Sequence, residues 1–160
     1  LEGLRAEVAD RTKKADLVVI EGPSHGSAMQ AGHHEMAGLW WAITHDLWRR
    51  RIPYAVASPH NLKIYACGVA NPAKDYPSHR RSRVAKGMVL AFVTERLGIP
   101  CEGPGKHDAA DAAVLAAIGL HGLGYPLLDL PSQHTRALHT VRWPVPMPPC
   151  AEDVEEVAAS

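Results

Sequence analysis

Two short apolar segments separated by a long helical one constrain the fold most. Residues 16–21, DLVVIE, are rich in β-branched side chains and end in an acid, and residues 53–57, PYAVA, form a second such run. Between them, residues 33–50 repeat apolar side chains at helical spacing. Strands joined through a helix run parallel in one sheet, so we expect an α/β fold with right-handed crossovers.

Four further segments are predicted as helices. They are residues 1–14, a helix that starts after Ser58 with Pro59 at its first position, residues 78–97 and residues 107–121. Residues 68–77 are predicted as a loop, and the proline-rich residues 123–160 as an irregular arm with an acidic tip. Two strands are too few for a stable sheet, so we expect further strands before Leu1.

The composition is that of one globular domain, with 46% hydrophobic and 21% charged residues. No apolar run approaches the ~20 residues of a membrane span, and no signal peptide is visible, so we expect a soluble cytoplasmic protein that contacts no membrane. The three cysteines, Cys67, Cys101 and Cys150, are far apart and form no CxxC motif. Neither a disulfide framework nor a zinc site is indicated, and the histidines also lack zinc-ligand spacing.

Charge is distributed unevenly although the net charge is zero. The last ten residues, AEDVEEVAAS, hold four of the seventeen acids and no base. The segment from Arg49 to Lys86 contains nine lysines and arginines and only one acid, Asp75. Such a region is typical of a surface that follows a phosphate backbone, and a solvated helix surface is the alternative. The cations that we expect to contact DNA are Lys63, Lys74, Arg80, Arg81, Arg83, Lys86 and Lys106.

The stretch KHDAADAAVLAAIGLHGLG, residues 106–124, places two aspartates in the first turns of an alanine-rich helix. Asp108 and Asp111 are three residues apart and share one face. Acids near a helix N-terminus can cap free N–H groups or complement the helix dipole. A second carboxylate on so apolar a helix needs a partner, which a divalent cation would provide. The stretch by itself leaves capping and metal binding open.

Glu21 favours the metal-binding interpretation. It ends the first predicted strand, and reactive groups of open α/β sheets lie beyond the carboxyl ends of the strands. If the alanine-rich helix packs across the sheet, then Glu21, Asp108 and Asp111 converge. Three such carboxylates would repel one another unless a hard cation such as Mg²⁺ or Mn²⁺ neutralised them. Two ions would activate water and stabilise the leaving oxygen of a phosphodiester.

Three sequence blocks resemble the RuvC-type Holliday-junction resolvases, which belong to the RNase H-like nuclease superfamily. These blocks are DLVVIEGP, SPHNLKIYACGVANPAK and KHDAADAAVLAAI, in this order. The resemblance covers residues 1–122 and implies a three-layer α/β fold with a central mixed sheet flanked by helices. It makes residues 1–122 a nuclease domain that lacks its first strands, followed by the arm 123–160.

The resemblance also implies a function. Glu21, Asp108 and Asp111 would be three of four catalytic, metal-binding carboxylates in a magnesium- or manganese-dependent endonuclease of DNA recombination and repair, with two ions per site. Lys74 would contact DNA phosphates, and Lys63 lies on the adjoining helix. The substrate would be branched DNA, a four-way junction. The protein would act as a homodimer through the helix that contains Trp40, Trp41 and Trp48, in a bacterial or phage-infected cell.

The sequence departs from the family at three places. The first catalytic aspartate has no counterpart, because Asp10 and Asp16 do not match its position in an opening strand. The loop after Glu21 offers only His25 and Met29 where the family often has an aromatic wedge, and DYPSHRRSRVAK is longer and more basic than usual. A non-catalytic nucleic-acid-binding module on the same fold is therefore the alternative function. A small-molecule hydrolase is disfavoured because no GxSxG, P-loop or GxGxxG motif is present.

Overall fold

The two predicted strands are present and pair in parallel. A computed structural model describes residues 2–23 and 33–146, and in it strand β1, Val18–Glu21, lies beside strand β2, Tyr54–Ala57. Val18 is opposite Tyr54 and Glu21 is opposite Ala57. Both strands therefore end at the same edge of the sheet. His25, Met29, Cys150 and the acidic C-terminal tip lie outside the described residues.

The predicted helices are also present, with small shifts of their ends. They are α1, Glu2–Thr12; α2, His33–Arg49; α3, Pro59–Cys67; α4, Ser78–Ala91; and α5, Lys106–Gly122. The segment predicted as one helix over 78–97 changes its hydrogen bonding after α4, and Phe92–Arg96 form a π-helix, η2. None of the helices in the described residues is long and apolar enough to cross a membrane.

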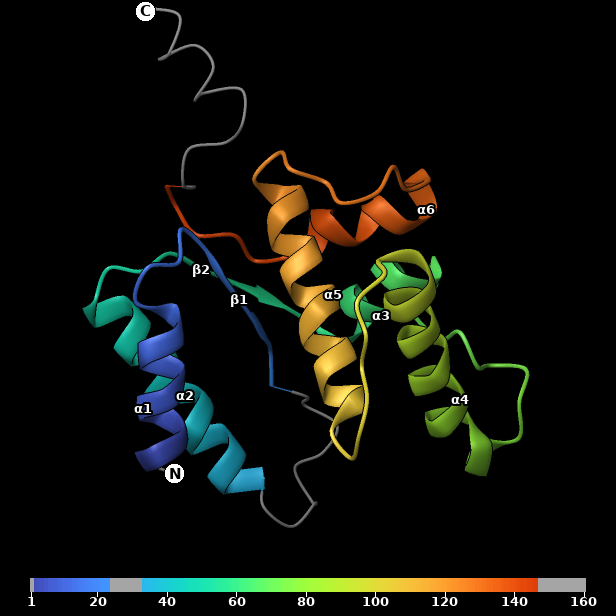
Figure 1. Cartoon of the computed structure of the whole chain (residues 1–160), viewed down its shortest axis with the longest axis horizontal. Helices are drawn as coiled ribbons and strands as arrows, with labels where there is room; N and C mark the ends of the chain where they lie inside the picture. The colour runs from blue at the N-terminus through green and yellow to red at the C-terminus, as the bar shows by residue number, and fades with distance from the viewer. Residues whose placement is uncertain (1, 24–32, 147–160) are drawn as a thin grey trace, which may run out of the picture.

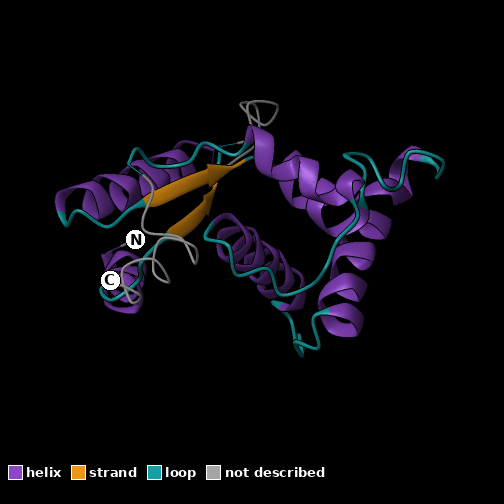
Figure 2. Cartoon of the chain, turned by 90° about the horizontal axis from the view of Figure 1, so that it is seen from above, coloured by secondary structure: helices purple, strands orange, loops and turns teal. Residues whose placement is uncertain are grey.

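The strands lie between two groups of helices. Helices α1 and α2 pack together on one side, and α5 packs on β1 from the other, as Figure 1 and the view from above in Figure 2 both show. Helix α3 packs on α5, and α4 lies farther out against α3 and α5. The fold is thus α/β with a small parallel sheet. The larger mixed sheet implied by the family resemblance does not form among the residues that the structure describes.

Helix α3 begins with the cap that the sequence predicts. The Ser58 side chain accepts a hydrogen bond from the Asn61 backbone N–H, and the Asn61 side chain accepts one from the Ser58 N–H, at 2.8 Å. The Asn61 amide also donates to the Ala137 carbonyl and the Thr140 hydroxyl, both at 2.6 Å. Because Asn61 is buried and fully bonded, it fixes the start of α3 against a distant segment.

That distant segment corrects the prediction of an irregular arm after residue 122. Ser132–Thr135 form a short α-helix, α6, and Arg136–Thr140 form a 3₁₀-helix, η3, both packed on α3. Leu130, Ala137 and Val141 are buried in the same core as α3 and α5. Apolar residues spaced among the prolines anchor this segment, so the described part of the arm belongs to the main core.

The apolar stripe predicted on α2 is only partly buried. Leu47 is fully buried and Thr44 nearly so, whereas Met36 is 67% exposed. The end of α2 near β2 therefore faces the core, and its first turns project from it. Trp41 and Trp48 are also exposed.

A substitution at Gly119 tests the contact between α5 and β1. A Cβ at this position would come within 2.8 Å of the Val19 side chain in β1, whereas a Cβ at Gly87 in α4 would meet nothing within 4 Å. We expect Gly119→Ala to lower the free energy of unfolding by about 1–3 kcal/mol through overpacking. The control Gly87→Ala should raise it by roughly 0.5–1 kcal/mol through helix propensity. Urea unfolding measures both; equal stabilisation would contradict the packing described.

Candidate active site

Glu21 is held at the carboxyl end of β1. Its backbone carbonyl accepts a hydrogen bond from the Trp40 indole N–H at 2.9 Å, and the next residue, Gly22, donates its N–H to the Ala57 carbonyl at 2.7 Å. The bond from Gly22 extends the strand pairing past Glu21, and the two bonds together fix the Glu21 backbone. The residue itself is exposed, so its carboxylate is available at the edge of the sheet.

The two aspartates do not act as helix caps. The N-cap of α5 is Gly105, which makes no side-chain bond to the helix, and Asp108 lies inside the first turn. Asp108 can still complement the helix dipole. Asp111, one turn farther, is half-buried. The capping interpretation therefore leaves Asp111 without a structural role in the described chain.

The packing of α5 carries Asp111 to Glu21. Gly119 lies against Val19 and Leu17 of the β1 side, while Asp111 lies close enough to Glu21 to alter its titration. The helix therefore runs antiparallel to the strand. From Gly119 to Asp111 the helix rises about 12 Å, and from Val19 to Glu21 the strand advances about 7 Å. A helix inclined across the strand thus brings its first turns to the end of β1.

Both carboxyl groups are harder to ionise than in water. The Glu21 carboxyl is partly shielded from solvent although the residue is exposed overall, and this desolvation raises its pKa; the charge of Asp111 raises it further. Desolvation is also the main cause of the raised pKa of Asp111, to which Asp108 adds. Glu21 responds to Asp111, and Asp111 responds to Asp108. Asp111 therefore interacts with both of the other predicted carboxylates, whereas Asp108 does not contribute to the pKa shift of Glu21.

Lys63 on α3 and Lys86 on α4 lie beside this group. The positive charges of both lower the pKa of Glu21 and of Asp111, against the larger effect of desolvation. No salt bridge joins either lysine to these acids among the described residues. The sequence predicted both lysines as DNA contacts and did not place them next to the carboxylates. The sequence did contain a signal that Lys63 lies near the carboxylates, because this residue is one turn into a helix that starts at the same sheet edge. It contained no such signal for Lys86.

His107 is a further residue of the site. The sequence analysis did not select it, yet it lies in the first turn of α5, half-buried, and its positive form favours the ionised Asp111. Its Nδ1 atom is buried and makes no hydrogen bond within the described part of the chain. In the sequence, the position of His107 directly before the D-x-x-D motif could have indicated that it belongs to the site.

The remaining predicted cations are exposed on the surface. Lys74 is in the loop between α3 and α4, and Lys106 begins α5. Arg80, Arg81 and Arg83 are exposed on the first turns of α4, and Arg81 donates to the Tyr76 carbonyl at 2.8 Å. None of these five shifts the pKa of Glu21 or Asp111.

The donor types at the site suit a hard divalent cation. All three acids offer carboxylate oxygens, which Mg²⁺ and Mn²⁺ prefer, and a cation would relieve the repulsion between them. Within residues 2–23 and 33–146, no three histidine, cysteine, aspartate or glutamate side chains lie close enough together to hold a metal ion. Glu21, Asp108 and Asp111 thus offer the oxygen donors that such an ion takes, without being arranged as a three-ligand cluster in the described chain.

Comparison with protein-family models, with curated proteins and with solved structures found no match to this chain.

The raised pKa of Asp111 predicts a stability effect. The folded protein holds this proton to higher pH than the unfolded chain does, so stability is lost as pH rises through the range between the two pKa values. We expect Asp111→Asn to be more stable than the parent at neutral pH in EDTA, with the difference vanishing in acid. The control Asp129→Asn changes an exposed aspartate outside the site. Thermal unfolding across pH measures both; a less stable Asp111→Asn at neutral pH would contradict this electrostatic account.

Proposed function

We propose that the protein is a metal-dependent, structure-specific DNA endonuclease that cuts branched DNA such as a four-way junction. The observation that carries the proposal is the grouping of Glu21 and Asp111, ninety residues apart in the chain, at the carboxyl end of β1. Desolvated carboxylates that repel one another destabilise a fold, and such groups are concentrated at functional sites.

The reaction would be hydrolysis of a phosphodiester. Water adds to phosphorus, and the bond to the 3′ oxygen breaks, which leaves a 5′-phosphate and a 3′-hydroxyl. Glu21, Asp108 and Asp111 would hold one or two Mg²⁺ or Mn²⁺ ions, which supply Lewis-acid stabilisation and activated water when bound. Lys63 and Lys86, which already face the carboxylates, would offset the negative charge of an incoming phosphate.

DNA would approach over α4 and the adjoining loop. The exposed Lys74, Arg80, Arg81 and Arg83 continue the positive charge outward from Lys86. Helix α4 has no acid in its first turn, so these cations are not neutralised by neighbours on their own turn. The same surface would serve a non-catalytic binding module, which differs from the nuclease only in whether the carboxylates support cleavage.

The homodimer remains part of this proposal. Met36 and Trp41 on the outer side of α2 are 67% and 68% exposed, and two copies meeting there would remove this apolar area from water. Two sites related by a twofold axis would match the symmetry of paired cuts in a four-way junction.

The cleavage prediction uses a labelled four-way junction beside a linear duplex of the same sequence. We expect paired nicks at the junction with Mg²⁺, none with EDTA, and at least a hundredfold loss in Asp108→Asn and Asp111→Asn. Asp75→Asn, an exposed aspartate in the basic region, is the matched control and should cut normally. Normal cutting by both site variants would refute the assignment, and junction binding without cleavage in the parent would establish the binding module.

The dimer prediction concerns mass in solution. We expect light scattering to give twice the mass of one chain, and Met36→Glu with Trp41→Glu to give a monomer because charges would face each other at the contact. Met88→Glu, on the exposed side of α4, is the control and should leave the mass unchanged. A monomeric parent at micromolar concentration would contradict the proposed dimer.

A further inference from the structure

All four tryptophans of the chain line a single groove. Trp40, Trp41 and Trp48 come from α2, and Trp143 comes from the segment that follows η3. The floor is formed by the start of β2, including Tyr54, and the cavity has a volume of about 710 Å³. This is within the usual range of ligand pockets, about 300–1,000 Å³.

The aromatic rings remain accessible to solvent. Trp41 is 68% and Trp48 is 69% exposed, and each has an aromatic neighbour on α2: Trp41 meets Trp40 edge-on, and Trp48 lies near His45. Trp40 and Trp143 are fixed by indole hydrogen bonds to the carbonyls of Glu21 and Leu138. The groove therefore combines two fixed rings with two ring faces open to a ligand.

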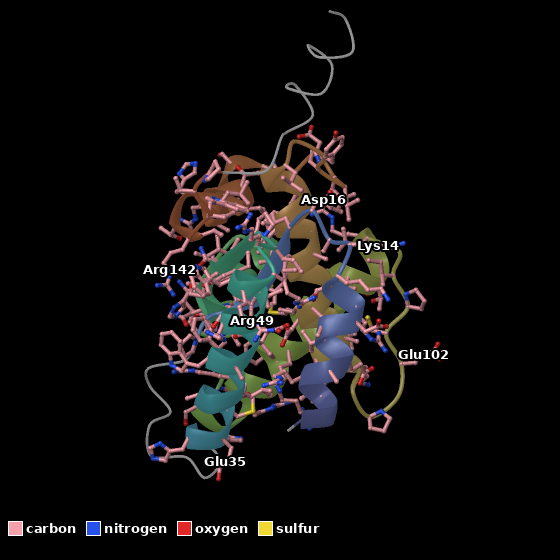
Figure 3. All side chains as sticks on the ribbon, turned by 90° about the vertical axis from the view of Figure 1, so that its left-hand side faces the viewer. Lys14, Asp16, Glu35, Arg49, Glu102 and Arg142 are labelled. Atoms are coloured by element: carbon pink, nitrogen blue, oxygen red, sulfur yellow. The ribbon has the colours of Figure 1, made fainter. Side chains whose placement is uncertain are left out.

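The charge of the groove is positive. Arg51 and Arg142 are its charged lining residues, and no acid belongs to the lining. Arg49, at the end of α2, is exposed but does not line the groove; Figure 3 labels it on this helix, with Glu35 at the opposite, lower end. Apolar ring faces beside guanidinium groups suit a ligand that has flat rings and negative charge.

The groove touches the end of β1 from the α2 side of the sheet. The indole of Trp40 lines the groove, and its N–H binds the backbone carbonyl of Glu21. Helix α5, which carries Asp111, packs on β1 from the other side, so the groove and the carboxylates are separate surfaces on opposite sides of the strands.

We propose that the tryptophan groove binds unpaired nucleotides of a DNA strand, with bases stacked on the exposed rings and phosphates paired with Arg51 and Arg142. Stacking on aromatic rings combined with arginine contacts is the general way in which proteins hold single strands without sequence preference. The inference deepens the proposed function and rests on it for the choice of polymer. It adds a site for a strand separated from the duplex, outside the carboxylates and the basic face of α4.

The inner part of the groove is distinct from the proposed dimer contact. Met36 does not line the groove, whereas Tyr54, Arg142 and Trp143 line it and belong to other elements than α2. Trp40, Trp41 and Trp48 belong to the helix predicted for the dimer contact and also line the groove. For this reason the test follows the mass of every variant.

The test uses a fluorescently labelled oligo-dT, the full chain and EDTA, so that no cleavage occurs. Because every tryptophan lines the groove, quenching of the intrinsic tryptophan emission reports binding there directly. We expect Arg51→Glu with Arg142→Glu to weaken binding at least tenfold and to abolish quenching. The control Arg5→Glu with Lys14→Glu makes the same change of net charge on exposed residues outside the groove. This control should bind oligo-dT like the parent and show the same quenching.

A second pair of variants separates stacking from charge. Trp48→Ala should weaken oligo-dT binding several-fold, and Trp48→Phe should recover most of it, because phenylalanine keeps a stacking face. Equal weakening by the two charge-reversal pairs, or unchanged binding in Trp48→Ala, would overturn the proposal. A change of mass in Arg51→Glu with Arg142→Glu, with oligo-dT binding intact, would assign the groove to a second copy instead.

The two proposals fail separately. Asp111→Asn should bind oligo-dT like the parent, because Asp111 does not line the groove. If Asp111→Asn also cuts junctions normally, the assignment of Asp111 to the catalytic site falls while the groove stands. If Asp111→Asn loses cleavage and the groove variants still bind oligo-dT normally, only the groove proposal falls.

Discussion

The close approach of α5 to β1 is the contact on which the rest of the site depends. Gly119 has no side chain, so the helix can lie directly on Val19, where even one methyl group would come within 2.8 Å of that residue. Ala110, Val114 and Ile118 on the same helix are buried in the core, where α5 also packs on α3 and α4. The contact with β1 sets the position of α5 relative to the strand that carries Glu21, and so the interaction of Asp111 with Glu21 depends on it.

The electrostatics at that edge oppose stability. Desolvation raises the pKa of both Glu21 and Asp111; the charge of Asp111 adds to the effect on Glu21, and the charge of Asp108 adds to the effect on Asp111. Lys63 and Lys86 reduce this cost without pairing closely, so the carboxylate oxygens stay uncommitted within the described chain. Because the two lysines offset only part of this electrostatic cost, packing does not explain why the carboxylates are at this position. This is the physical ground for treating the edge as functional.

The sequence predicted the elements well because their signals are local. Serine before proline at residues 58–59 marked the start of α3, and the β-branched runs marked both strands. The placement of Glu21 at a strand end followed directly from this order. Long-range contacts were harder to predict. The packing of η3 on α3 combines buried apolar residues such as Ala137 with hydrogen bonds from the buried Asn61 amide, and the proline-rich composition of the segment gave no sign of it. The position of Lys86 depends on the orientation of α4, which no periodicity reveals. The partial exposure of α2 was missed because an apolar stripe does not tell which of its turns reach the core.

The backbone of Arg142 covers one edge of the two-stranded sheet. Arg142 and Val56 exchange both of their backbone hydrogen bonds, at 2.9 Å, on the side of β2 that faces away from β1. This single antiparallel bridge occupies the middle of the outer edge of β2, so another strand cannot run along it. Any strand that joins this sheet, from this polypeptide or from a different one, must add alongside β1. The half of the molecule that carries Glu21 is therefore the half at which the sheet can grow.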